Sequence, residues 1–255
     1  AHGIFNVTNT LIFLPFVSVL AWIVTKLVPM KEQELEFGPK YLDDRMLATP
    51  SVALGQAQHE IVRMGNLARE TLEDATDYFF KRDAKTAALA LKKEQLVNEL
   101  DRKITDYMAK IHQNGLPATE SEKANALMHT INDIERIGDH AENIVELTDF
   151  TINNKVEFSK DAERELRTML EAADHVVSRA LYALEHNDKA AAKDALEGEA
   201  ELDRMEMEYR TAHIQRLNQN LCTGNSGAIF LDIISNLERI GDHSKNIAEF
   251  VLKME

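Results

Sequence analysis

Two ten-residue segments of the chain are nearly identical and lie about one hundred residues apart. ERIGDHAENI occupies residues 135–144, and ERIGDHSKNI occupies residues 238–247. The similarity extends upstream, where Glu94 matches Glu199 at a separation of about 105 residues. The separation falls to about 103 at the two segments, which indicates a slightly shorter hairpin in the second copy. A duplication of about two hundred residues restricts the fold to two similar halves with approximate two-fold symmetry.

Each half has the pattern of three helices. From Pro50 onward, apolar residues recur at spacings of three and four, and only five prolines and ten glycines interrupt the chain. An aromatic content of 6% argues against a β-sandwich or barrel. In the first half, one helix is expected from Pro50 to about Phe80, a second from there to the NGLP at 114–117, and a third from about Glu120 to Asn153. In the second half, a fourth helix is expected from a Ser159 cap to the HND at 186–188, and a fifth from there to about Cys222. The TGNSG at 223–227 is expected to break the chain, and a sixth helix to run from it to the C-terminus.

Short hairpins between these helices force neighbouring helices to run antiparallel. The predicted fold class is therefore all-α, with six helices in a pair of antiparallel three-helix bundles. Repeat one covers residues 50–155, repeat two covers residues 159–255, and together they form one domain over 50–255.

The first thirty residues differ from the rest. The segment is apolar from Leu11 to Val24, and counted from Ile4 to Val28 it gives roughly 37 Å of helix, enough to span a bilayer. We expect residues 1–30 to form one transmembrane helix, followed by a charged juxtamembrane linker over 31–49. The alternatives are a signal peptide, disfavoured because a basic n-region and a small-residue cleavage site are absent, and a buried helix of a soluble protein.

Composition limits the partners. Lysine and arginine number 29 against 43 aspartates and glutamates, so the formal net charge is −14. This charge repels phosphate backbones and attracts cations, which excludes nucleic acid as an expected partner. Cys222 is the only cysteine, so an intrachain disulfide cannot form and a reducing, cytosolic setting is expected.

The repeated segments place two acids on one helix face. Glu135 and Asp139 are one turn apart, as are Glu238 and Asp242, and the pattern predicts that Asn143 and Asn246 extend each stripe. Arg136 and Arg239 should point about 100° away and leave the acids unpaired. Gly138 and Gly241 lie mid-helix, where glycine is unfavourable by roughly 1 kcal/mol, so we expect a neighbouring helix or a ligand to approach closely there. His140 and His243 are interpreted as helix-end or surface residues more readily than as ligands.

A second set of acids lies on the preceding helices. Glu199 and Asp203 are one turn apart with Glu206 beyond, and Glu94 with Asn98 corresponds to them in the first copy. Antiparallel helices can bring such ladders together as hard oxygen ligands for Fe, Mn, Mg, Ca or Zn. The competing interpretation is a solvated acidic face, which a single acidic pair on a helix usually indicates. The doubling of the pattern favours metal binding.

The doubled motif resembles the PhoU family of bacterial phosphate-signalling proteins. It is carried by IERIGDH at 134–140 and LERIGDH at 237–243, each ending a three-helix repeat, and the resemblance covers residues 51–255. It implies two three-helix bundles whose surface acids hold multinuclear iron or zinc clusters. The implied metal ligands are Glu94, Glu135, Asp139, Glu199, Asp203, Glu238 and Asp242. Asn98 departs from the motif, so the resemblance implies a weaker or missing first cluster.

The N-terminal stretch AHGIFNVTNTLIFLPF, followed by KLVP, resembles the last membrane helix of the bacterial sodium/phosphate cotransporter family. This resemblance implies a regulatory domain, cytoplasmic over residues 31–255, at the end of a cell-membrane transporter for phosphate and sodium. It would sense metal or phosphate state and modulate phosphate uptake. The implied partners are the transporter's own membrane domain, phosphate and sodium through that domain, metal ions, and a second copy in a homodimer.

Two alternatives remain. The first is a membrane-anchored signalling adaptor of the PhoU type that docks onto a histidine kinase or an ABC phosphate importer. The second is a di-metal carboxylate enzyme, which is disfavoured because the inward-facing Glu-x-x-His pairs of that class are absent. A nucleophile constellation and a glycine-rich phosphate loop are also absent, so the expectation is that the chain is not an enzyme.

Overall fold

The computed structural model describes residues 35–254, and these contain six long helices. They are α3 (Pro50–Lys81), α4 (Ala84–Gln113), α5 (Ala118–Asn153), α6 (Lys160–His186), α7 (Lys189–Asn218) and α8 (Gly224–Lys253), preceded by the short 3-10 helix η2 (Asp44–Ala48). The all-α prediction with six helices is confirmed. The predicted membrane helix over 1–30 lies outside the described residues. Between residues 35 and 254, every helix is too short or too polar to span a bilayer.

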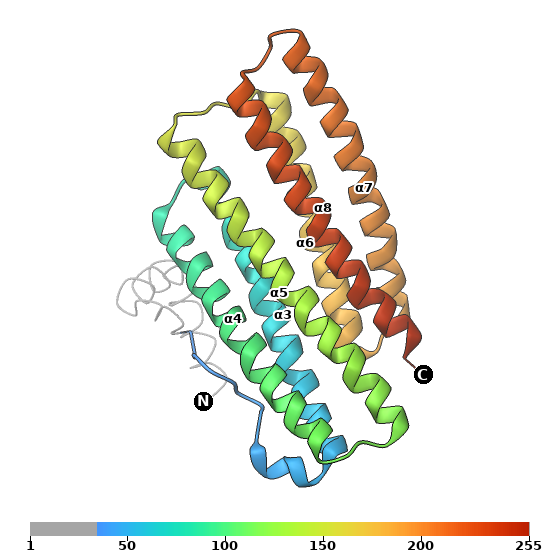
Figure 1. The fold of residues 1–255 in the computed structure, drawn as a ribbon. Helices are drawn as coiled ribbons and strands as arrows, with labels where there is room; N and C mark the ends of the chain where they lie inside the picture. The colour runs from blue at the N-terminus through green and yellow to red at the C-terminus, as the bar shows by residue number, and fades with distance from the viewer. Residues whose placement is uncertain (1–34, 255) are drawn as a thin grey trace, which may run out of the picture. The chain divides into compact units, whose positions relative to one another are not determined.

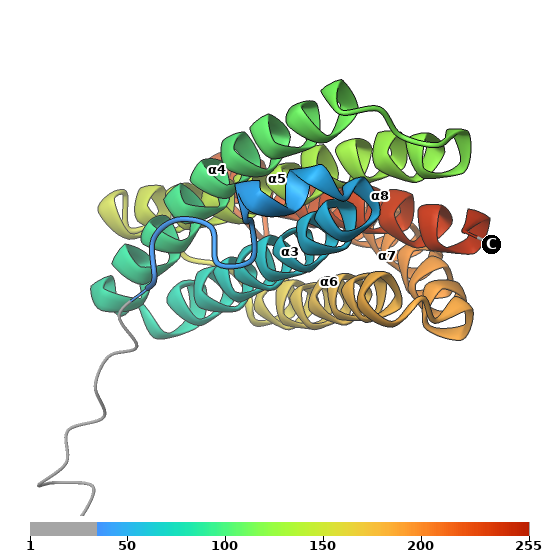
Figure 2. The ribbon, with the colours of Figure 1, turned by 90° about the horizontal axis from the view of Figure 1, so that it is seen from below.

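The helices pack as two bundles of three. Helices α3, α4 and α5 contact one another, as do α6, α7 and α8, and the two bundles meet along α5 with α8 and along α3 with α6. Figure 1 shows α5 and α8 side by side in the centre, with α4 and α7 on opposite outer sides. The view in Figure 2 shows the same separation of α4 from α7. Fully buried aliphatic residues fill both bundles, among them Leu72, Leu96 and Ile134 in the first and Leu166 and Ile234 in the second.

The two hairpins that open the bundles are built alike. Arg82 follows the last residue of α3 and Asn187 follows the last residue of α6, and both adopt the left-handed conformation, with φ of 58° and 52°. The next residue caps the following helix: the Asp83 side chain accepts a hydrogen bond from the Lys85 amide, and Asp188 accepts from the amide of Ala190. Such a turn reverses the chain within two or three residues, which makes the helices antiparallel.

Two predicted boundaries differ from the structure near the last hairpin. Helix α7 ends at Asn218 and not near Cys222, and the stretch at 223–227 starts α8 instead of breaking the chain. Thr223 and Ser226 form a reciprocal capping box, so the small polar residues that suggest a loop satisfy the first amides of a helix. The predicted Ser159 cap is confirmed, since its side chain accepts from the Ala162 amide at 3.2 Å.

The motif glycines allow close helix packing, as predicted. A Cβ atom added to Gly241 would lie 3.0 Å from Cδ1 of Leu202 on α7, and one added to Gly138 would lie 3.3 Å from Cγ1 of Val97 on α4. Each repeat therefore brings its last helix close to its middle helix at the level of the acidic ladders.

The motif histidines and asparagines join the two bundles. His140 Nδ1 lies 2.8 Å from Oδ1 of Asn236, and His243 Nδ1 lies 2.9 Å from Oδ1 of Asp133. The two imidazole rings stack with centroids 5.8 Å apart. The prediction that these histidines are helix-end or surface residues is wrong, because they lie partly buried in mid-helix and join α5 to α8.

The asparagines take part in the same contacts. Asn143 Nδ2 donates to Asn236 at 3.1 Å, and Asn246 Nδ2 donates to Asp133 at 3.0 Å. The prediction that they extend the acidic stripes is therefore wrong. Each four-residue step advances the helix face by about 40°, which turns these asparagines from the acids toward the other bundle.

Candidate metal centre

The second repeat contains a group of converging carboxylates. Glu199 and Asp203 on α7 and Asp242 on α8 each offer an oxygen atom, and these atoms lie within 4.8 Å of one another. Glu199 is buried, with 3% of its surface exposed, whereas Asp203 is exposed at the rim. Three oxygen donors at this spacing suit a hard divalent cation that retains water ligands.

A lysine already neutralises part of this group. Lys245, one turn after Asp242, donates from Nζ to Oε1 of Glu199 at 2.8 Å, and this hydrogen bond raises the pKa of Lys245. A cation coordinated by Glu199 would have to displace this ammonium group.

Glu238 lies one turn before Asp242, and the negative charges of the same carboxylates act on it. Burial raises its pKa, and the neighbouring carboxylates of Asp242 and Asp203 raise it further. Glu206 also faces this region but is held by an ion pair with Arg210 on its own helix. Glu238 is therefore placed to join the ladder, although it is outside the group of three.

The first repeat has a denser acidic field and lacks the lysine. Glu94 on α4 is 4% exposed and accepts a hydrogen bond from Asn98. Burial raises its pKa to about 7, with smaller contributions from the carboxylates of Glu142, Asp139 and Glu135. Glu142 occupies the position that Lys245 has in the second repeat, so one repeat has a fourth acid where the other has a base.

Arg136 modifies the first cluster. Its Nη1 lies 3.2 Å from Oδ2 of Asp139, and its Nε lies 3.4 Å from Glu135. The prediction that this arginine points away from the ladder is wrong, because its long side chain folds back along the helix surface. It is half exposed and compensates only part of the repulsion, since the pKa of Glu135 is still raised, mainly by burial and then by Asp139.

The seven predicted ligands thus fall into two clusters with different geometry. Within residues 35–254, only Glu199, Asp203 and Asp242 converge closely enough to share one ion. Glu238 flanks that group, and Glu94, Glu135 and Asp139 lie in one electrostatic field without forming such a group. Lys245 and Glu142 were missed, although aligning the repeats by charge as well as by identity would have revealed the exchange.

The comparisons with known proteins agree with this architecture. The model of the PhoU domain matches residues 61–148 and 166–251, one copy in each repeat. A phosphate-specific transport system accessory protein PhoU homologue from Xylella fastidiosa is 28% identical over 193 residues, covering 76% of this chain and 79% of the relative. The crystal structure of PhoU from Pseudomonas aeruginosa aligns with a TM-score of 0.74 at 22% identity, covering 79% of this chain and 96% of that one.

A different kind of relative covers the N-terminal residues as well. The putative inorganic phosphate export protein YjbB of Escherichia coli is 23% identical over 255 residues, and the alignment covers 99% of this chain but 47% of YjbB. The chain thus spans about half the length of that relative. Because the matched model covers most of both three-helix repeats, the chain belongs to the PhoU domain family.

Proposed function

We propose that this chain is a regulatory domain for phosphate transport whose state depends on a divalent metal ion. The supporting observation is the convergence of Glu199, Asp203 and Asp242 within 4.8 Å beside Lys245. Three carboxylates and one displaceable ammonium give two states, with the lysine on Glu199 or with the metal on it. The bound ion would supply positive charge that relieves carboxylate repulsion and fixes α7 against α8.

The site favours oxygen-seeking ions. The converging donors are carboxylates alone, and the motif histidines are engaged between the bundles. For the second repeat we therefore propose an ion of Mn, Fe, Mg or Ca in preference to Zn. We also propose that this site holds a single ion in preference to a multinuclear iron or zinc cluster. The full ligand set of the proposal is the three converging acids, with Glu238 as a fourth, and Glu94, Glu135 and Asp139 for the first repeat.

We further propose that the regulated protein is a membrane transporter joined to this domain. The alignment with the phosphate export protein YjbB extends over nearly all of this chain, including residues ahead of α3. The proposal includes a cell-membrane location with residues 31–255 on the cytoplasmic side, and coupling of phosphate to sodium in the membrane part. Under it, the chain's direct partner is that membrane part, reached through residues 31–49.

One experiment tests both halves of the proposal. The complete protein is expressed in cells with Glu199→Gln, Asp203→Asn and Asp242→Asn combined, and phosphate movement and bound metal are measured together. Loss of stoichiometric metal with altered phosphate flux supports the proposal. Metal loss with unchanged flux refutes the regulatory role, and unchanged metal content refutes the site. An equal number of acids neutralised elsewhere, at Glu201, Glu208 and Glu163, controls for net charge.

The second candidate is an adaptor for a separate phosphate importer. It is favoured by the phosphate-specific transport system accessory proteins among the relatives, such as that of Xylella fastidiosa. Reconstitution of the complete protein in liposomes separates the two, because only a transporter moves phosphate across the bilayer without an added partner.

A further inference from the structure

A buried carboxylate on α3 binds the backbone of the segment that precedes the helix. Glu60 has no exposed surface, and its Oε2 accepts hydrogen bonds from the amides of Lys40 at 2.7 Å and Tyr41 at 2.6 Å. Its Oε1 accepts from Nη1 of Arg63 at 2.5 Å, and the same nitrogen lies 3.1 Å from the carbonyl oxygen of Gly38. One turn of α3 therefore contacts backbone groups of Gly38, Lys40 and Tyr41 without relying on their side chains.

Residues 37–49, which we name the strap, have further anchors on α4. The hydroxyl of Tyr107 donates to the carbonyl oxygen of Asp43 at 2.9 Å, and Nζ of Lys110 lies 3.0 Å from Asp44. Figure 2 shows the strap, in blue, lying against the first bundle before α3 begins. The Gly38 backbone has φ of +88°, which only glycine adopts readily, so the bend at this position requires the glycine that the sequence has there.

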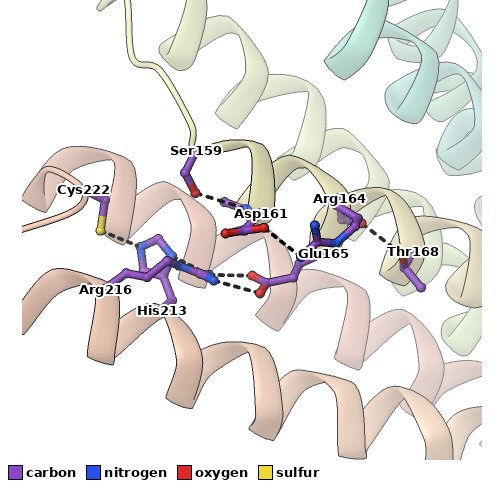
Figure 3. Close-up of polar contacts among 9 residues, drawn as sticks. Ser159, Asp161, Arg164, Glu165, Thr168, His213, Arg216 and Cys222 are labelled. Atoms are coloured by element: carbon purple, nitrogen blue, oxygen red, sulfur yellow. Dashed lines mark hydrogen bonds and ion pairs between the residues drawn. The ribbon is translucent and has the colours of Figure 1, made fainter. Parts of the chain in front are cut away.

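The second repeat indicates what the strap replaces. Glu165 occupies the position of Glu60 in the duplicated pattern, and it accepts two hydrogen bonds from Arg216 of α7, at 2.8 Å and 2.5 Å. Figure 3 shows this fork between α6 and α7. The position of Arg216 is taken in the first repeat by Ile111, which cannot pair with a carboxylate. The strap amides therefore satisfy Oε2 of Glu60, whereas both oxygens of Glu165 are satisfied by Arg216 inside the second bundle.

We propose that the strap is a fixed coupling element, held on the first bundle by Glu60, so that movement of α3 is passed directly to the chain before residue 37. Undocking would take two charge-assisted hydrogen bonds from a carboxylate that has no access to water. If the linker predicted over residues 31–49 were flexible, it would instead absorb such movement. The docking does not depend on the proposed function, although its use in transport regulation does.

Amide hydrogen exchange on the full chain tests the docking, with Glu60→Gln as the perturbation. Glutamine is isosteric, but whichever way its amide turns, an NH2 group faces a donor that the carboxylate accepts from. We expect the Lys40 and Tyr41 amides to exchange slowly in the wild type and about tenfold faster or more in the variant. Glu165→Gln is the matched control, since it places the same conflict in the other bundle and should leave strap exchange unchanged.

Two results would overturn the proposal: free-peptide exchange of the Lys40 and Tyr41 amides in the wild type, or equal acceleration by the two substitutions. Exchange of α4 core amides such as Leu100 reports whether the bundle remains folded. If Glu60→Gln fails to fold, Tyr107→Phe decides: it removes the hydroxyl that lies 2.9 Å from the carbonyl oxygen of Asp43 and 3.0 Å from Oε1 of Gln56, and it leaves Glu60 and its hydrogen bonds in place. That variant should accelerate exchange across residues 40–46 by about threefold or more, and unchanged exchange refutes the docking.

Discussion

Exchanging one charge between the repeats should reverse how each acidic cluster responds to a cation. Lys245→Glu gives the second repeat the fourth acid of the first, and Glu142→Lys gives the first repeat the lysine of the second. Lys245 pairs with a Glu199 side chain that is 4% exposed, whereas the lysine itself is 38% exposed. The interaction therefore lies between a surface ion pair and a buried one.

The size of the effect follows from that intermediate burial. Removing the lysine leaves Glu199 uncompensated, so Lys245→Glu should lower the free energy of unfolding by about 2 kcal/mol in chelator. A metal ion that binds the variant no longer has to break the Lys245–Glu199 ion pair. The free energy of about 2 kcal/mol saved in this way corresponds to roughly thirtyfold tighter binding of Mn²⁺. Glu142→Lys should do the reverse: it should lower the pKa of Glu94 from about 7 and stabilise the metal-free protein by about 1 kcal/mol at pH 8.

Urea denaturation with and without Mn²⁺, together with isothermal titration calorimetry, measures both quantities. Manganese at a hundred times its dissociation constant should restore about 2.7 kcal/mol to the Lys245→Glu variant. If that variant is as stable as the wild type in chelator and binds Mn²⁺ no more tightly, Lys245 does not compete for the site and the reasoning fails. Lys253→Glu, a substitution of an exposed lysine on the same helix, controls for the change in net charge.

Three further predictions concern stability. Glu94 has a pKa of about 7 in the folded protein, above its ordinary value of 4.5, so the wild type loses stability as the pH rises from about 4.5 to about 7. Glu94→Gln should match the wild type near pH 4 and exceed its stability by about 1–3 kcal/mol at pH 8.5 in chelator, as measured by urea denaturation. Gly241→Ala should destabilise the protein by about 1 kcal/mol, because its Cβ would press on buried Leu202. Gly55→Ala, with open space around it, should stabilise the protein by about 0.5–1 kcal/mol. Equal shifts in Tm for the two variants would contradict the packing argument. Thr223→Ala removes the capping box of α8 and should lower stability by about 1 kcal/mol, and a loss confined to α8 amides in hydrogen exchange would identify the helix start as the cause.

The sequence predicts the fold well because its determinants are local or repeated. The spacing of apolar residues sets the helices, and the turns at Arg82 and Asn187, each followed by a capping aspartate, set their antiparallel order. The acidic ladders are also local, since Glu199 and Asp203 share a face whenever α7 is a helix. Their convergence with Asp242 requires α7 to pack on α8, for which Gly241 is the visible signal.

Contacts between the bundles could not be predicted in the same way. His140 and Asn143 have no local feature that separates a ligand from an interface residue, and their partner Asn236 lies almost one hundred residues away. The role of Glu60 is equally hidden, because a glutamate among helical residues resembles any exposed acid. Only its complete burial and its bonds to backbone amides distinguish it.

The pairing of the two bundles has the form of a closed two-fold interface. His140 contacts Asn236 while His243 contacts Asp133, and Arg69 on α3 pairs with Asp174, its own counterpart position on α6. In an interface of this kind both repeats use the same surface, so this surface is no longer free once two repeats have packed together. A third repeat would find no free face of this type, unlike in a solenoid, where every unit offers a new one. A further repeat therefore could not be added through the surface that joins these two.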